Sequence, residues 1–268
     1  MYHFDWSIFF HYLWPPTALQ DPLIRTGLVV TIVVSILAQA LGVIFGLFAA
    51  LGKMSKFVPF RVVADAYVWY FRGTPLLVQM VLLFFGFGVM HIYDFPDILL
   101  GEFRISGAIQ AGMLALAINE GAYMAEIVRA GIEAIDPGQM EAAKSLGMTF
   151  GLAMRRIVLP QAAKVIVPPL GNEFNNMMKT TSLMEVISAS ELFFAFTQIN
   201  ARVFKPFELF IALSLYYLAM TTIWQLIQSR IEAGLGERKG AERPPGFFDR
   251  LFSGGAFGVG SQLGKGAR

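Results

Sequence analysis

The sequence contains no cysteine, and this absence excludes several kinds of chemistry at once. Without thiols the chain has no disulfide, no thiolate metal site and no cysteine nucleophile. Histidine is also scarce: His3, His11 and His91 are the only three, and none lies in the core of an expected helix. No H-E-x-x-H motif is present, and no serine or aspartate has an obvious base beside it. The residues therefore offer little basis for an active site.

Charge is the second shortage. Only 15% of the 268 residues are charged, whereas a soluble domain carries about 25%. Hydrophobic residues make up 56% of the chain and the mean hydropathy is +0.58, more apolar surface than one water-soluble core could hide. The composition indicates an integral membrane protein. The net charge of +2 is too small to favour a nucleic-acid partner.

Long runs without charge locate the expected membrane helices, since a span needs about 20 helical residues. Three runs are clean: Thr26–Gly52, Gly73–Tyr93 and Leu209–Ser229. Two further apolar segments, 105–132 and 175–200, carry charged residues. We therefore expect an all-α membrane protein with about five transmembrane helices. The stretch 57–71 is expected to lead into the second helix, which is broken or kinked near Gly73-Thr74-Pro75.

The positions of Lys and Arg predict the orientation, because cytoplasmic loops are enriched in both. If the loop with Lys53, Lys56 and Arg61 lies inside, 15 of the 21 basic residues fall on the inner side. The N-terminus is then outside and the C-terminus inside. Residues 1–21, rich in aromatic side chains, are expected to lie on the outer leaflet, and residues 22–231 form the transmembrane domain. Residues 232–268, rich in Gly and charge, are expected to be a loose cytoplasmic tail.

The inner segment 136–160 has the pattern of two short helices joined by a glycine. Asp136, Pro137 and Gln139 stand at the cap, first and third positions of the first helix, a variant of the capping box. Gly147 is placed to end that helix in a left-handed conformation, and Thr149 can cap the second. Pro160 is expected to stop the second helix or to hand the chain over to the next element. A helix–glycine–helix hairpin at the membrane surface is suited to docking a partner.

This segment resembles the EAA loop of the permeases of ABC importers. Glu141-Ala142-Ala143, Gly147 and Ile157-Val158-Leu159-Pro160 match that loop, including nine residues between the glycine and the isoleucine. Three further segments resemble the polar amino-acid permeases (histidine, glutamine and arginine type) within that family. They are Arg72-Gly73-Thr74-Pro75-Leu76-Leu77-Val78-Gln79, Asn119-Glu120-Gly121-Ala122-Tyr123 and Lys179-Thr180-Thr181-Ser182-Leu183.

The resemblance implies the architecture of a type I ABC-importer permease in the inner (plasma) membrane of a bacterium. It implies two ATP-binding subunits, a second permease (identical or sister), and a periplasmic or external protein that delivers an amino acid. ATP and magnesium would bind to the partner ATPase, and no cofactor to this chain. The residues implied in ATPase coupling are Glu141, Ala142, Ala143, Gly147, Ile157, Leu159 and Pro160.

Polar residues inside the expected helices are candidates for the substrate path, because they usually face protein or a water-filled cavity. The candidates are Arg72, Thr74, Gln79, Asn119, Glu120, Lys179, Thr181, Ser182 and Glu185. Arg72 could instead extend to the membrane surface, and Lys179 could be an interfacial charge. Glu126 and Arg129, three residues apart, are expected to pair with each other. Glu185 and Glu191 would lie about 120° apart on one helix.

The acidic excess in the two charged helices slightly favours cationic or neutral polar amino acids. Two other functions remain as alternatives, a secondary amino-acid carrier and a membrane-embedded enzyme. The odd number of helices and the docking hairpin count against a carrier. The chain is not expected to hydrolyse ATP, because the glycines at Gly260 and Gly264 are one residue too close for a phosphate-binding loop.

Overall fold

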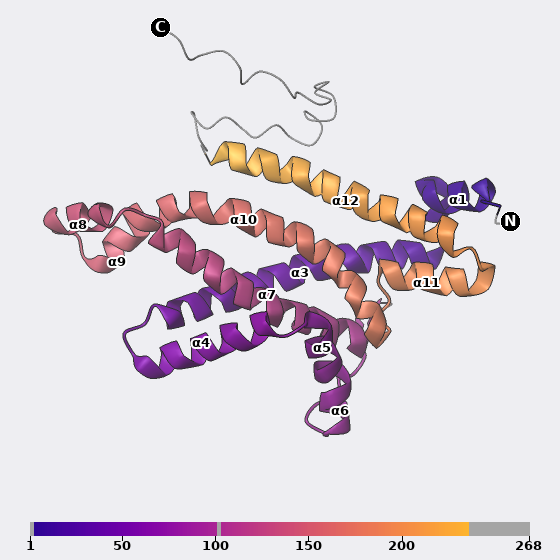
Figure 1. Ribbon diagram of the computed structural model, residues 1–268, viewed down its shortest axis with the longest axis horizontal. Helices are drawn as coiled ribbons and strands as arrows, with labels where there is room; N and C mark the ends of the chain where they lie inside the picture. Colours follow the sequence, from indigo (N-terminus) through magenta and orange to yellow (C-terminus); the bar gives the residue numbers. More distant parts are fainter. Residues whose placement is uncertain (1–2, 101–102, 236–268) are drawn as a thin grey trace, which may run out of the picture. The chain divides into compact units, whose positions relative to one another are not determined.

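The computed structural model describes residues 3–100 and 103–235, and this part of the chain is almost entirely helical. Two long helices, α3 (Pro22–Lys53) and α7 (Gly107–Glu133), lie along each other at its centre (Figure 1). The other elements precede and follow them along the chain. Before α7 come α1 (Trp6–Leu13), α2 (Pro15–Ala18), α4 (Val58–Gly73), α5 (Leu76–Val81), a π-helical turn (Leu82–Gly86) and α6 (Phe87–Val89). After α7 come α8 (Pro137–Ser145), α9 (Phe150–Ala153), a π-helical turn (Met154–Val158), α10 (Leu159–Thr180), a 3₁₀ helix (Thr181–Ile187), α11 (Leu192–Val203) and α12 (Pro206–Gly234).

Two helices are long and apolar enough to cross a membrane by themselves, α3 with 32 residues and α12 with 29. They contain the charge-free runs Thr26–Gly52 and Leu209–Ser229, so both helices were correctly predicted. Asp21 starts α3 by accepting a hydrogen bond from the amide of Leu23, with Pro22 at the first helical position. The expected helix over 105–132 is also present, as α7.

The charge-free run Gly73–Tyr93 does not form the single span that was expected. The chain bends by 106° between α4 and the helical segment Leu76–Val89, and the two pass as a span only when taken together. Pro75 is the cause, because it lacks an amide hydrogen and forces Thr74 before it into an extended conformation. The predicted break at Gly73-Thr74-Pro75 is therefore confirmed, whereas the supposed lead-in is a 16-residue helix, α4.

The expected helix over 175–200 is wrong as well. α10 ends at Thr180, and the 3₁₀ helix that follows ends at Ser188, which has a left-handed conformation (φ 59°). Glu191 then starts α11, its carboxylate accepting hydrogen bonds from the amides of Phe193 and Phe194 at 2.8 and 2.7 Å. Glu185 and Glu191 thus lie in different elements, and the 120° relation between them does not hold.

A short antiparallel hairpin departs from the otherwise all-α architecture. Strands β1 (Ile98–Leu100) and β2 (Phe103–Ile105) pair with Ile98 opposite Ile105. Asp97, just before β1, accepts hydrogen bonds from Arg104 and from the amide of Gly107, the first residue of α7. One carboxylate therefore joins the hairpin to the start of the central helix.

Hydrogen bonds to this carboxylate predict how the hairpin responds to acid. The amide of Gly107, and then Arg104, hold the pKa of Asp97 below its usual range. The stabilisation is therefore complete above the ordinary carboxyl pKa and is lost as the pH falls through the lowered value. We expect the amide of Gly107 to stay protected from hydrogen exchange from pH 7 to 5, after correction for intrinsic rates, and to lose protection below about pH 4. In Asp97→Asn the protection of the Gly107 amide should be weak at every pH. Protection that still changes with pH in this variant would contradict the assignment.

Glycines let α3 and α7 approach closely. A Cβ added to Gly42 would lie 2.6 Å from Cγ of Glu120, and one added to Gly46 would lie 2.3 Å from Cβ of Met124. Gly42 and Gly46, a G-x-x-x-G pair, thus let one helix pack closely against the other. Because position 42 faces 120 and position 46 faces 124, the two helices run parallel.

The N-terminal residues form helix α1, which packs beside the start of α12. Asp5 caps α1, and its own amide donates to the carboxylate of Glu208 on α12 at 2.8 Å. Trp6 and Trp14 remain largely exposed, with 62% and 63% of their surface accessible. Exposed tryptophans suit the predicted position on the outer leaflet, which stays a prediction. Of the predicted tail over 232–268, all but the first four residues lie outside the described residues.

Candidate functional site

The docking hairpin predicted from the sequence is formed by α8 and α9. Asp136 caps α8 by accepting a 2.7 Å hydrogen bond from the amide of Gly138, and Thr149 caps α9. Gln139 does not complete a capping box: its side-chain oxygen accepts from the side chain of Gln161 at 3.2 Å and so ties α8 to the start of α10. Pro160 does not end a helix. It lies in the first turn of α10, so the second of the two predicted alternatives holds and the chain continues into the next helix.

Gly147 ends α8 in the left-handed conformation that the sequence predicted, with φ of 79°. Its amide donates to the carbonyl of Lys144, and the next amide, of Met148, donates to the carbonyl of Ala143. These two bonds define a Schellman motif, which turns the chain sharply at a helix end. The geometry of the hairpin therefore depends on one glycine.

The structure divides the residues implied in coupling between the surface and the interior. Glu141 and Ala142 are exposed, and the Glu141 carboxylate has no ion pair or hydrogen bond within 3–100 and 103–235. Ala143, by contrast, is buried at 4% exposure, so it packs inside the hairpin instead of facing outward. Leu159 and Pro160 are exposed at the start of α10, where Ile157 is half-buried.

Three exposed apolar residues beside Gly147 were missed from the sequence. They are Leu146, Phe150 and Leu152, with 83%, 61% and 44% of their surface accessible. The sequence did contain a sign of them. Leu146 directly precedes Gly147, and Phe150 and Leu152 flank Gly151, in helices too short to have a face buried in a core. Together with Glu141 and Ala142 they give the hairpin a mixed apolar and acidic surface.

A second polar site surrounds the break between α4 and α5. The carbonyl of Phe71 would normally accept from the amide of residue 75, but Pro75 has none. Side chains take its place: Gln79 and Asn119 both donate to this carbonyl, at 3.0 and 2.9 Å. Asn119 also donates to the side-chain oxygen of Gln79 at 3.0 Å, and Gln79 donates to the carbonyl of Thr74.

Three of the candidate path residues therefore meet at the break, and their hydrogen bonds stabilise it. They are Thr74, Gln79 and Asn119. Arg72 is exposed beside them, its guanidinium 5.3 Å from the centre of the Tyr123 ring on α7. The break therefore presents one cation together with amide groups that already have partners.

We expect Gln79→Leu to destabilise the protein by about 1–3 kcal/mol, because it removes the side-chain donor to the half-buried Thr74 carbonyl and the acceptor of the Asn119 amide. Asn119→Leu should have a similar effect. The double variant should cost less than the sum, since each single variant already removes the hydrogen bond from Asn119 to Gln79. Gln225→Leu is the matched control: Gln225 is exposed on α12 without a hydrogen bond in the described part, so its effect should stay within about 0.5 kcal/mol. Thermal unfolding in detergent measures all four; equal midpoints for Gln79→Leu and the control would refute this role.

Glu120 lies next in sequence to Asn119 but faces a different neighbour. It is buried at 6% exposure between α7 and α3, where its carboxylate accepts a 3.1 Å hydrogen bond from Gln39. Gln39 was missed from the sequence, although it is the sole amide in the run Thr26–Gly52 and shares a helix face with Gly42. Glu173 on α10 interacts electrostatically with Glu120, so acidic groups from two helices lie near each other.

The remaining candidates lie together where α10 passes into the 3₁₀ helix. Thr181 and Ser182 donate to the carbonyls of Met178 and Lys179, which are one turn earlier. Lys179 is exposed and Glu185 is half-buried. No hydrogen bond or ion pair among the described residues connects this group to the break at Pro75.

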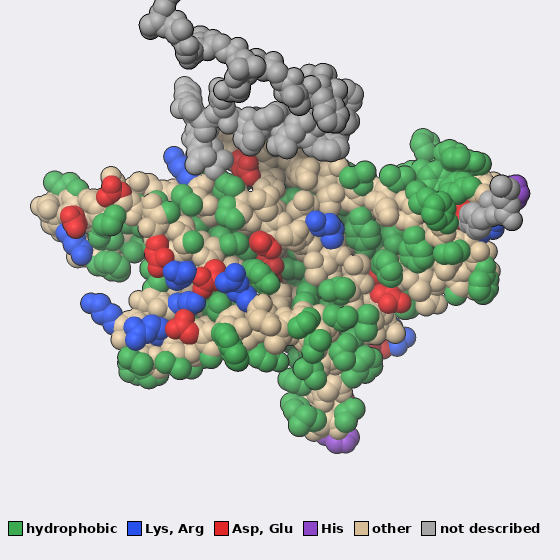
Figure 2. Space-filling view, in the orientation of Figure 1, with side chains coloured by type: hydrophobic (Ala, Val, Ile, Leu, Met, Phe, Trp, Pro, Cys, Tyr) green, Lys and Arg blue, Asp and Glu red, His purple; other side chains and the backbone are tan. Residues whose placement is uncertain are grey.

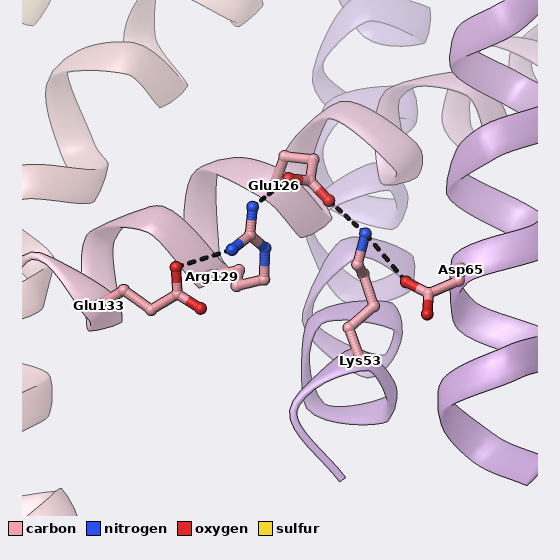
Figure 3. Close-up of polar contacts among 5 residues, drawn as sticks. All are labelled: Lys53, Asp65, Glu126, Arg129 and Glu133. Carbon is pink, nitrogen blue, oxygen red and sulfur yellow. Dashed lines mark hydrogen bonds and ion pairs between the residues drawn. The ribbon is translucent and has the colours of Figure 1, made fainter. Parts of the chain in front are cut away.

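An ion network joins the C-terminal ends of α3 and α7 to the middle of α4 (Figure 3). Glu126 accepts from Lys53 on α3 and from Arg129, each at 2.6 Å, which confirms the predicted Glu126–Arg129 pair. Lys53 also lies 3.2 Å from Asp65 on α4, and Arg129 lies 2.7 Å from Glu133. Glu133 stands three residues before Asp136, so the network reaches the base of the docking hairpin.

The chain matches a known family over most of its length. Residues 42–237 match the family described as the inner membrane component of binding-protein-dependent transport systems. An arginine transport system permease protein, ArgU, of Corynebacterium glutamicum is 37% identical over 234 residues, covering 85% of this chain and 71% of the relative. ArtQ of Bacillus subtilis, also an arginine transport system permease protein, is 36% identical and covers 82% of this chain and 95% of the relative.

Solved structures agree with the sequence relatives. An amino acid ABC transporter, crystallised with histidines, has a chain 41% identical to this one, with a TM-score of 0.72 and coverage of 81% of this chain and 96% of the other. An inward-facing MetNI methionine ABC transporter shares the fold, with a TM-score of 0.64 over 81% of this chain and 97% of the other. The expected architecture of a type I ABC-importer permease is thereby confirmed. The chain belongs to the family of inner membrane components of binding-protein-dependent transport systems.

Proposed function

We propose that this chain is the permease subunit of an ABC importer that carries a polar amino acid across the inner membrane of a bacterium. The observation that carries the proposal is the hairpin of α8 and α9, shaped by Gly147 and exposing Glu141 beside apolar residues, in a chain of this family. Relatives named as arginine and glutamine permeases support an amino acid as the substrate. The chain then crosses the membrane about five times, with its N-terminus outside.

The partners follow from this role. Two ATP-binding subunits dock on the hairpins of two permeases, identical or sister chains, and an external binding protein delivers the amino acid. ATP and magnesium are held by the ATPases. This chain supplies the path and the coupling and does no hydrolysis.

Coupling is proposed to pass from the hairpin to the helices through fixed connections. ATP-driven closure of the ATPases moves the hairpin, and α7 leads directly into it. The ion network of Lys53, Asp65, Glu126, Arg129 and Glu133 makes α3 and α4 follow α7 as a unit. The cavity then alternates between outward-facing and inward-facing states.

The substrate path is proposed to run between the break at Pro75 and the end of α10. Arg72 and Lys179 can attract a carboxylate, whereas Glu120 and Glu185 can attract an ammonium or guanidinium group. Thr74, Gln79, Asn119, Thr181 and Ser182 supply a polar fringe. The acidic groups favour a cationic or neutral polar amino acid.

The test is purification of the tagged chain from its own membranes in mild detergent, followed by uptake of radiolabelled amino acids in proteoliposomes. The proposal predicts an ATP-binding subunit in equal amount and uptake that requires ATP. Uptake by the chain alone, driven by an ion gradient, would support the carrier alternative instead.

A further inference from the structure

A groove between α3 and α4 has no part in the function proposed above. Its volume is about 740 Å³, and its walls are almost wholly apolar. Among the residues that line it are Phe45, Phe48, Leu51, Phe60, Val63 and Tyr67. Phe48, Phe60 and Val63 stay more than 60% exposed, at 69%, 62% and 69%. The groove therefore presents a concave apolar surface that nothing in the described part of the chain covers.

At the end of the groove lined by Tyr67, the polar side chain already has a hydrogen-bond partner. The Tyr67 hydroxyl, which lines it, donates to the carbonyl of Ile118 at 2.6 Å. At the opposite end, Ser55 accepts from the amide of Phe57. A polar ligand would gain little along the walls of this groove, whereas a hydrocarbon chain would be solvated well.

Positive charge gathers at the open end. Lys56 and Arg61 are exposed next to the lining residues Ser55 and Phe60, and their side chains have no ion pair or hydrogen bond within residues 3–100 and 103–235. Asp65, the nearby acid, is already paired with Lys53. Figure 2 shows Lys and Arg side chains where α3 turns into α4, next to a band of hydrophobic side chains along α4. This end thus carries an excess of cationic groups.

The groove runs along the last turns of α3 and ends at the loop before α4. Its walls on α3 run from Phe45 to Gly52, about 10 Å at 1.5 Å per helical residue, and Ser55 lies just beyond the end of the helix at Lys53. One leaflet is half of a hydrocarbon core of about 30 Å, hence about 15 Å, so the groove spans about two-thirds of a leaflet. The basic end belongs on the cytoplasmic side by the positive-inside rule, where anionic lipids gather.

We propose that this groove binds an anionic phospholipid of the cytoplasmic leaflet, with an acyl chain between α3 and α4 and its phosphate at Lys56 and Arg61. Each basic residue favours an anionic lipid by about fivefold near a membrane surface. Two such residues together give a preference over a zwitterionic lipid of about 25-fold.

Native mass spectrometry of the purified complex, exchanged into micelles with equal phosphatidylglycerol and phosphatidylcholine, tests the proposal. The unmodified complex should retain phosphatidylglycerol about 25-fold over phosphatidylcholine, and Lys56→Gln with Arg61→Gln should reduce this preference to less than twofold. Lys164→Gln with Arg230→Gln, which changes two exposed basic residues elsewhere, is the matched control and should keep it. Val63→Trp, which fills the groove from its exposed rim, should remove the retained lipid. Equal retention of both lipids by the unmodified complex, or full preference in Lys56→Gln with Arg61→Gln, would overturn the proposal.

A second copy of the chain is the competing occupant, and the absence of cysteine makes it testable. Val63→Cys creates a single thiol in the groove. Ready cross-linking of two copies through Cys at this position would place a protein interface there and overturn the lipid proposal. Labelling of Val63→Cys by a lipid-soluble maleimide, without cross-linking, is the result expected for a lipid-filled groove.

Discussion

Gly147→Val is expected to reduce ATP-dependent uptake by about an order of magnitude or more while leaving the chain inserted in the membrane. At φ of 79° a side chain with a Cβ is strained, at a cost of about 1–2 kcal/mol, and more for a β-branched residue. Such a cost reduces the population of the native turn about 5- to 30-fold. The two hydrogen bonds of the Schellman motif are then lost and α8 no longer meets the ATPase in the right orientation.

The surroundings of Gly147 allow backbone strain to be separated from steric conflict. A Cβ at this position would meet no atom of the chain within 4 Å, so no clash inside the subunit explains a defect. Gly147→Asn should be milder than Gly147→Val if the backbone conformation matters, because asparagine tolerates the left-handed region. If both variants fail equally, the space above Gly147 is occupied by the partner.

The matched control is Gly151→Ala on the same hairpin. Gly151 also has open space around it, but it lies in the helical turn of α9. Its replacement should leave uptake unchanged. Uptake rates in proteoliposomes, normalised to the amount of complex recovered by size-exclusion chromatography, measure all three variants. Normal uptake by Gly147→Val would show that this turn does not couple the subunits.

The helices that the sequence predicted well are those defined by local properties. α3, α7 and α12 follow from apolar runs of sufficient length, and Gly147 follows from helix-end chemistry confined to a few residues. In each case the signal and the structure lie within the same short stretch of chain. The fold class could therefore be predicted before any contact was known.

The errors arose where an apolar run contains residues that break a helix. Pro75 indicated a break, but the sequence did not give its 106° bend, nor that Asn119, 48 residues further on, would donate to the Phe71 carbonyl there. Between 175 and 200 the apolar composition concealed a reversal made by Ser188 and by the cap at Glu191. Hydropathy measures burial and does not detect a side chain that ends or begins a helix.

The candidate site was predictable in part for the same reason. The residues of the docking hairpin are neighbours in sequence, so their pattern was visible. Gln39 and Glu120 are 81 positions apart, and nothing local in either segment specifies that they meet. The same holds for Lys53 and Glu126, 73 positions apart. Long-range polar pairs inside a membrane protein are set by helix packing, which composition leaves open.

The packing of α3 on α7 leads to the second large effect, which concerns folding. We expect Gly46→Leu to prevent accumulation of folded protein. A Cβ at Gly46 would lie 2.3 Å from Cβ of Met124 and 2.9 Å from the backbone atoms of Ala125 and Gly121. Backbone cannot move aside as a flexible side chain can, so the helices must separate along their shared face.

Graded substitutions make this prediction quantitative. Gly46→Ala adds one methyl group, and overpacking of this kind costs about 1–3 kcal/mol. Each kcal/mol lowers the unfolding midpoint by about 2–4 °C in a protein of this size. Gly42→Ala should be milder, because the atoms 2.6 and 2.8 Å from the added carbon belong to the Glu120 side chain.

Gly86→Ala provides the control for the loss of a helical glycine. The nearest atoms to its added carbon belong to the Leu82 side chain, at 3.8 and 3.9 Å, which is ordinary van der Waals contact. This variant should unfold at the midpoint of the unmodified protein or slightly above it, since alanine favours the helix. Fluorescence-detected size-exclusion chromatography after heating in detergent ranks the four proteins. If Gly46→Ala unfolds together with Gly86→Ala, the two helices do not depend on close approach, and the glycine face has another role.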